Sequence, residues 1–140
     1  MNDVESMRLA LALAERGRGW TAPNPMVGAV IVKDGRIIAE GWHEHIGGLH
    51  AERNAFAHCT EDAAGADLYV TLEPCPMCAG AIVNSRIERV YFGARDPKAG
   101  AFGSLFDINS YGLNHKPDVT GGVLEDRCAL LLSNFFSELR

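Results

Sequence analysis

The hydrophobic and polar positions at the two ends of the chain follow a helical period. Near the start, Asp3–Arg18 repeats its apolar residues close to the 3.6-residue spacing of an amphipathic helix. Near the end, Leu124–Leu139 does the same. The apolar positions are Val4, Met7, Leu11 and Ala14 in the first segment and Leu124, Cys128, Leu131, Leu132, Phe135 and Phe136 in the last. We therefore predict one helix at each end, the first ended by Gly17 and Gly19.

Shorter apolar runs between these helices predict strands. Met26–Val32 is typical of a buried strand, and Asp34-Gly35 is a strong hairpin signal that returns the chain along Arg36–Trp42. Three more strands are predicted further along, at Leu68–Leu72, Arg89–Phe92 and Val119–Val123, the last weakened by paired glycines.

Two further helices are predicted between the strands. One covers roughly His50–Cys59, and the other has Pro74 in its first turn and runs to about Asn84. Strands that alternate with helices after an initial hairpin indicate an α/β domain. We expect a three-layer α/β/α fold, with a mixed central sheet of about five strands covered on both faces.

Composition narrows the class of protein without identifying it. The chain has 140 residues, 47% hydrophobic and 22% charged, with no repeat or linker-like stretch, which predicts one domain over residues 1–140. No apolar stretch is long enough to cross a bilayer. Asp3 and Glu5 are atypical of a secretory segment. We expect a cytoplasmic protein with reduced thiols.

The net charge of −5 bears on possible partners. Dedicated nucleic-acid binders usually carry a basic surface, because neutralising phosphates supplies much of their affinity. An acidic chain is thus a less typical RNA partner, although Arg95, Lys98 and Lys116 could form a local basic rim.

Two short motifs carry the candidate chemistry, His50-Ala51-Glu52 and Pro74-Cys75-Pro76-Met77-Cys78. Cysteines three positions apart at a helix start lie on one face, so both sulfurs can reach a single ion. The positive end of the helix dipole also favours their thiolate form. Two thiolates and one imidazole from His50 leave the fourth position of a tetrahedral ion open, which is the pattern of a catalytic rather than a structural zinc site.

Glu52 is the candidate proton carrier. A zinc ion makes water far more acidic than it is in bulk solution. A carboxylate beside the ion can accept that proton and deliver it to the substrate, first as a base and then as an acid. This role requires His50 to stand in the first turn of its helix, with the Glu52 side chain directed into a cavity and not bound to the metal.

Other interpretations of these motifs remain open. A lone Cys-x-x-Cys also occurs in redox sites and zinc ribbons, but a redox site has no need of His-x-Glu. A structural zinc clip, or a zinc-stabilised binding module without turnover, requires a fourth ligand. The available donors are Cys59, Cys128, His43, His45, His58 and His115. Cys59 and Cys128 are more simply small buried hydrophobes.

His-x-Glu followed by Pro-Cys-x-x-Cys resembles the signature of the zinc nucleobase deaminases, and the whole chain resembles the cytidine deaminase-like superfamily. From Leu72 onward it is similar to bacterial tRNA-specific adenosine deaminases. The stretches that carry this resemblance are Thr71–Ala81, Ser85–Ile87, Phe92–Gly100, Gly103–Leu105, Leu113–His115 and Leu131–Phe136. The resemblance implies a homodimer that holds Zn²⁺ and converts the wobble adenosine of a tRNA anticodon to inosine.

From Met7 to about Val70 the chain resembles a different member, the deaminase domain of the riboflavin pathway. The residues that carry this resemblance are Pro23–Gly28 and Gly41–Glu52. It implies that Asn24 and His43 contact a pyrimidine. Ala51 and Pro74, which belong to the two motifs and neighbour the metal ligands, are the other candidate substrate contacts. Riboflavin-pathway enzymes carry a longer, lysine-bearing insertion between the two cysteines, which this chain lacks.

Three hypotheses follow. We favour a tRNA adenosine deaminase, because the carboxyl-terminal resemblance is long. The second is a deaminase of a small molecule, either a riboflavin-pathway pyrimidine or a free base or nucleotide such as guanine or cytosine. The third is the non-catalytic zinc module. The sequence does not reveal which base enters the pocket.

Overall fold

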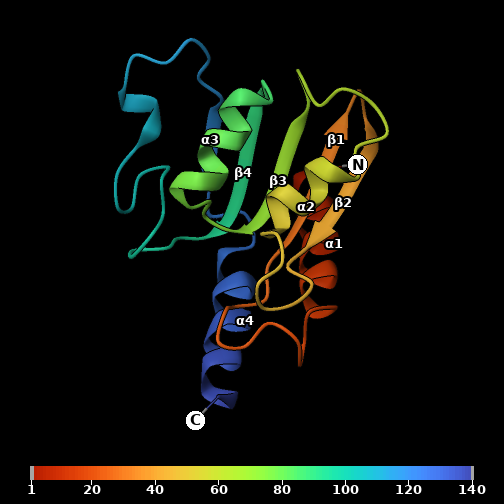
Figure 1. Ribbon diagram of the computed structural model, residues 1–140, viewed down its shortest axis with the longest axis vertical. Coiled ribbons are helices and arrows are strands. Elements are labelled where there is room, and N and C mark those ends of the chain that lie inside the picture. Colours follow the sequence, from red (N-terminus) through yellow and green to blue (C-terminus); the bar gives the residue numbers. More distant parts are fainter. Residues whose placement is uncertain (1, 140) are drawn as a thin grey trace.

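A five-stranded mixed sheet forms the middle layer of the computed structural model, which describes residues 2–139 (Figure 1). The strands are β1 (Gly28–Lys33), β2 (Arg36–Trp42), β3 (Asp67–Leu72), β4 (Arg89–Ala94) and β5 (Asp118–Gly121), in the order β2-β1-β3-β4-β5. β1 pairs antiparallel with β2 and β3, whereas β3, β4 and β5 run parallel. The predicted fold class is confirmed.

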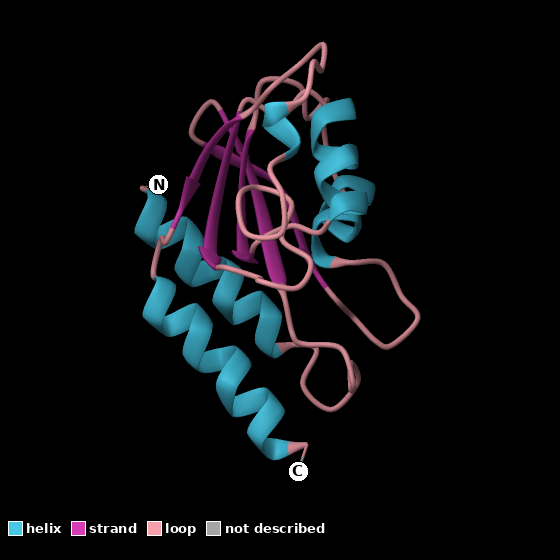
Figure 2. Ribbon diagram, turned by 90° about the vertical axis from the view of Figure 1, so that its left-hand side faces the viewer, coloured by secondary structure: helices cyan, strands magenta, loops and turns pink. Residues whose placement is uncertain are grey.

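Helices cover both faces of the sheet (Figure 2). They are α1 (Asp3–Glu15), α2 (Ala51–Ala57), α3 (Pro76–Asn84) and α4 (Glu125–Glu138), with a short 3₁₀ helix at Ile108–Ser110 that the sequence pattern did not indicate. α2 and α3 lie on one face, and α1 and α4 lie side by side on the other. None of the helices in residues 2–139 has the length and apolar character required to cross a bilayer.

Alternation along the strands divides the core between the two faces. In β3, Leu68 and Val70 pack toward α2 and α3, whereas Tyr69 packs toward α1. Tyr69 stacks on Tyr91 of the adjacent strand, with ring centroids 4.7 Å apart, and donates a hydrogen bond to Asp3 of α1. The sheet is therefore buried on both sides, as a three-layer domain requires.

α2 packs directly on the backbone of β2. A Cβ atom built at Gly41 would overlap backbone atoms of Ala51 and Ala55, so only glycine permits this approach. Asn54 of the same helix accepts a hydrogen bond from the Trp42 amide. These contacts fix the start of α2 relative to the end of β2.

The prediction that Pro74 lies in the first turn of the third helix is wrong, because that helix begins at Pro76. Cys75 is extended, with φ −75° and ψ 171°, and a residue before proline is disfavoured in the helical region. Pro74 precedes the helix, and its carbonyl accepts a hydrogen bond from the Ala101 amide. The two prolines thus place Cys75 at the N-cap.

Candidate metal centre and pocket

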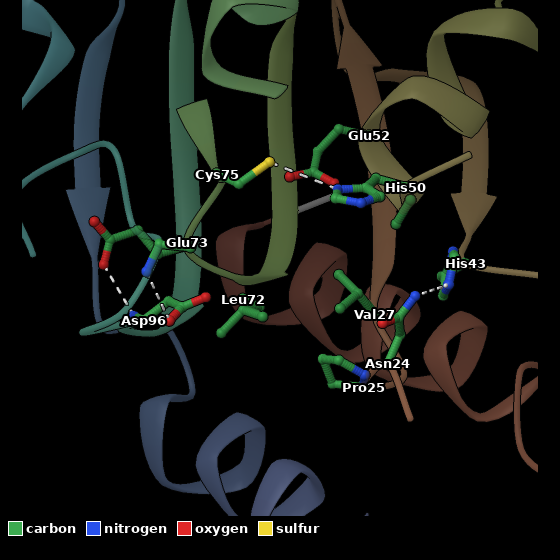
Figure 3. A pocket seen from close by; sticks show the side chains of 12 residues that line it. Asn24, Pro25, Val27, His43, His50, Glu52, Leu72, Glu73, Cys75 and Asp96 are labelled. Atoms are coloured by element: carbon green, nitrogen blue, oxygen red, sulfur yellow. Dashed lines mark hydrogen bonds between the residues drawn. The ribbon is translucent and has the colours of Figure 1, made fainter. Parts of the chain in front are cut away.

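One pocket lies where several elements meet at the same edge of the sheet (Figure 3). β3 and β4 are parallel, so their carboxyl ends lie at this edge, where loops commonly form binding sites. The N-terminal ends of α2 and α3 complete the surroundings. The pocket is lined by Asn24, Pro25, Val27, His43, His50, Ala51, Glu52, Leu72, Glu73, Cys75, Asp96 and Ala99.

Three side chains from two helix starts come together at one side of this pocket. His50 is the N-cap of α2, Cys75 is the N-cap of α3, and Cys78 lies in the first turn of α3. The His50 Nδ1 atom lies 3.6 Å from Cys75 Sγ and 3.4 Å from Cys78 Sγ. The structure thus brings together the three residues predicted to bind metal.

The spacing of these atoms fits zinc. Bond lengths of about 2.3 Å to sulfur and about 2.0–2.1 Å to nitrogen imply a nitrogen-to-sulfur distance of about 3.6 Å in a tetrahedral site. Both observed separations are close to this value. Within residues 2–139, no fourth histidine, cysteine or acidic side chain joins the group, as a closed structural site would require.

Hydrogen bonds within the cluster favour the thiolate of Cys75. Bonds from Cys78 and from His50 lower the pKa of the Cys75 thiol to about 4, against the opposing effect of burial. The same hydrogen bond between the two cysteines raises the pKa of the Cys78 thiol, so the proton of the pair stays on Cys78 and Cys75 carries the thiolate character that metal binding requires.

Glu52 lies beside the three ligands without joining them. Its side chain comes from the first turn of α2, is 4% exposed, and extends toward the space between Cys75 and His50 (Figure 3). Burial raises the pKa of the Glu52 carboxyl to about 7. A carboxyl group with a pKa near neutrality is suited both to accepting and to returning a proton.

Asn24 and His43 form the opposite side of the pocket. His43 Nδ1 lies 2.9 Å from the Leu49 carbonyl, which can only accept, so this nitrogen carries the hydrogen. His43 Nε2 is then the acceptor, and Asn24 Nδ2 donates to it across 3.3 Å. With one amide hydrogen used in this way, the Asn24 side chain keeps its Oδ1 acceptor and its second N–H donor for other hydrogen bonds (Figure 3).

Of the other two candidate substrate contacts, only one reaches the pocket. Ala51 lines the pocket, whereas Pro74 is buried and is not among the lining residues.

The remaining histidines and cysteines lie outside the metal cluster. His58 Nδ1 bonds the Asn54 carbonyl, and His115 Nε2 bonds the Ile87 carbonyl. Cys128 is buried, and Cys59 is half-buried against the core.

Sequence reasoning gave no site role to Glu73, Asp96 or Ala99, although all three line the pocket. Glu73 carried a detectable signal, because it is an acidic residue that directly follows a buried strand and precedes Pro74. Asp96 and Ala99 belong to the stretch Phe92–Gly100 that resembles tRNA deaminases, but only the folded loop after β4 brings them to the pocket.

Comparisons with known proteins identify similar chains. The family model described as "Cytidine and deoxycytidylate deaminase zinc-binding region" matches residues 1–94. The riboflavin biosynthesis protein RibD of Actinobacillus pleuropneumoniae is 46% identical over 97% of this chain and 37% of its own length. The tRNA-specific adenosine deaminase of Haemophilus influenzae is 44% identical over 99% of this chain and 85% of its own length.

A solved structure agrees with these matches. The diaminohydroxyphosphoribosylaminopyrimidine deaminase and 5-amino-6-(5-phosphoribosylamino)uracil reductase of Thermotoga maritima superimposes with a TM-score of 0.84 and 42% identity. The match covers 96% of this chain and 40% of that one. The chain therefore spans only about two fifths of the RibD-type proteins that it resembles.

Proposed function

The chain belongs to the cytidine and deoxycytidylate deaminase family, and we propose that it hydrolyses the exocyclic amine of a nucleobase. The proposed zinc ligands are His50, Cys75 and Cys78, and the proposed proton carrier is Glu52. The observation that carries this proposal is the open set of three ligands beside a buried carboxyl group.

A reaction sequence follows from the positions of these residues. Zinc, when bound, supplies a Lewis acid that makes water a nucleophile at neutral pH. The Glu52 carboxylate accepts the proton of the attacking water and delivers it to a ring nitrogen of the base. It then accepts the proton of the hydroxyl group added to the ring carbon and transfers that proton to the amine, so that the carbon–nitrogen bond breaks, ammonia leaves and a carbonyl group remains. Its buried position excludes bulk water, which would compete for these protons.

For the substrate, we propose the wobble adenosine of a tRNA anticodon. The loop after β4, which resembles that of tRNA deaminases, contributes Asp96 and Ala99 to the pocket. Only Pro76 and Met77 separate the two cysteines, so the lysine-bearing insertion of riboflavin-pathway enzymes has no counterpart. The likeness to the Haemophilus influenzae tRNA deaminase supports the same choice.

One observation favours a second candidate, a small pyrimidine of the riboflavin pathway. The hydrogen-bonded Asn24 and His43 line the pocket, and both belong to the part of the chain that resembles the riboflavin enzymes. The identity to RibD and the likeness to the Thermotoga maritima structure point the same way.

An assay of ammonia release separates the two substrates. The zinc-loaded protein is incubated with an anticodon stem-loop that has adenosine at the wobble position, and separately with a panel of free bases and pyrimidine nucleotides. We expect inosine in the RNA and no release from the small molecules. A stem-loop with guanosine at that position is the control. Release only from a pyrimidine would support the second candidate, and no release from either would overturn the deaminase proposal.

We further propose that the protein is a cytoplasmic homodimer. Leu49 and Met77 are 41% and 50% exposed beside the outer surfaces of α2 and α3, which gives an apolar surface for a second copy. The four cysteines are free, as in a reducing compartment. Light scattering of Met77→Asp should show a shift from dimer to monomer relative to the parent protein.

A further inference from the structure

Glu73 is a buried acidic residue that the proposed chemistry does not use. It directly follows β3, precedes Cys75 by two positions, and is only 2% exposed. None of the ion pairs formed within residues 2–139 includes it. A carboxylate in such a place is costly unless hydrogen-bond donors replace the water that it loses.

Those donors all come from one segment, residues 96–104. Glu73 Oε1 accepts from the Asp96 amide at 3.1 Å and from the Ser104 hydroxyl. Glu73 Oε2 accepts from the amides of Phe102 and Ser104, each at 3.1 Å. Both oxygens are thus satisfied by a stretch of chain more than twenty residues away in the sequence.

Backbone contacts on either side hold the same two segments together. The Glu73 amide donates to the Ala94 carbonyl at 2.8 Å, and the Ala101 amide donates to the Pro74 carbonyl at 2.9 Å. A Cβ atom built at Gly100 would overlap the Glu73 carboxylate, so a larger residue there would displace the carboxylate from its donors. The carboxylate lies at the centre of this contact.

The loop held in this way forms one wall of the pocket. Asp96 and Ala99 line the pocket together with Glu73 itself, and Cys75 belongs to the metal cluster (Figure 3). We propose that Glu73 is a positioning residue, whose carboxylate fixes the wall formed by residues 96–104 relative to Cys75 and thereby determines how tightly substrate binds. The effect of Glu73 on substrate binding rests on the proposed deaminase function, whereas its effect on the loop does not.

Glu73→Gln tests the proposal with little change of shape. The amide nitrogen of glutamine is a donor and faces groups that are themselves donors, so some of the donors in residues 96–104 lose their acceptor. Hydrogen exchange, which needs no substrate, should show protection at Asp96, Phe102 and Ser104 reduced by about tenfold or more, as expected when hydrogen bonds to a charged group are lost. Glu61→Gln, at an exposed glutamate paired with Arg36, is the matched control and should leave this protection unchanged.

Kinetics and metal analysis give the second measurement. For the substrate that is turned over, KM should rise about tenfold while kcat and zinc content stay close to those of the parent. Ser104→Ala removes a single donor and leaves the carboxylate in place, so it should fold and show the same changes to a smaller degree.

Unchanged hydrogen exchange in both variants would overturn the proposal. A loss of zinc and kcat at constant KM would also overturn it, because it would show that Glu73 positions the metal ligand Cys75 and not the loop. If no substrate is found, the proposed function fails separately, and the exchange measurement still decides whether Glu73 fixes the loop.

Discussion

The two sides of the pocket are built in different ways. The metal side takes its four groups from two short segments, residues 50–52 and 75–78, each at the start of a helix. The opposite side, where we propose that substrate binds (the substrate side), takes Asn24, His43 and Asp96 from three loops that are distant in the sequence. Local backbone geometry fixes the groups within each short segment of the first set, and packing of two helices joins the segments, whereas the second set depends entirely on how the loops pack. The structure therefore constrains the chemistry more tightly than the choice of substrate.

The two sides of the pocket also belong to parts of the chain that resemble different deaminases. The hairpin side, with Asn24 and His43, resembles riboflavin-pathway enzymes, and the loop after β4 resembles tRNA deaminases. β3 and β4 join the two parts in one sheet, with Leu68 paired to Val90 and Val70 to Phe92. The pocket is thus a composite, and substitutions on its two sides should have separable effects.

Removal of a metal ligand should have the largest effect. Cys78→Ser replaces a buried thiol in the cluster, so we expect zinc to be lost and activity to fall by at least about a thousandfold, because residues of one catalytic unit fail together. Zinc content and ammonia release measure this. Cys59→Ser, at a half-buried thiol outside the cluster, is the control and should keep both. A zinc-loaded, active Cys78→Ser would contradict the assignment of the ligands.

Glu52→Gln should separate catalysis from metal binding. The amide cannot carry the proton, so kcat should fall by about 10²–10⁴-fold while zinc remains bound. Single-turnover kinetics and metal analysis on the same sample check both points, with exposed Glu40→Gln as the control. Unchanged turnover in Glu52→Gln would favour the non-catalytic zinc module.

Gly41→Ala should disturb the metal side through packing alone. The new methyl group overlaps the backbone of α2, and crowding of this kind costs about 1–3 kcal/mol of stability. Urea unfolding measures the loss. Gly80→Ala in α3 is the control, because a Cβ there meets no other atom within 4 Å and alanine is the better helix former. Equal stability of the two variants would show that α2 is free to move away from the sheet.

Asn24→Ala should have the smallest effect, and that effect should be on substrate binding and not on the metal. Loss of its hydrogen bonds should raise KM by about tenfold at nearly constant kcat and zinc content. Because His43 orients the Asn24 amide, Asn24→Ala and His43→Ala together should cost less than the sum of their separate effects. Exposed Asn134→Ala is the control. Additive effects would show that the two residues act independently.

Much of the architecture followed from local patterns. The helical periodicity at both ends of the chain predicted the outer helices, because it reflects which helix face is buried. The Asp34-Gly35 turn predicted the hairpin, and the alternation of strands with helices predicted the layers. The start of α3 was placed two residues early, because Pro74 matched a first-turn signal that Pro76 in fact provides. The short 3₁₀ helix has no hydrophobic period that could have predicted it.

By itself, the sequence predicted the metal ligands, because Cys75 and Cys78 lie one helical turn apart at a helix start and His-x-Glu supplies the third ligand and the carboxyl group. Only the packing of α2 beside α3 brings His50 to the two sulfurs. Only the tertiary structure placed Asp96 and Ala99 in the pocket, oriented the Asn24 amide through His43, and surrounded Glu73 with donors from residues 96–104. These contacts join segments that local propensity does not relate, and they form only when the sheet brings its strand ends together.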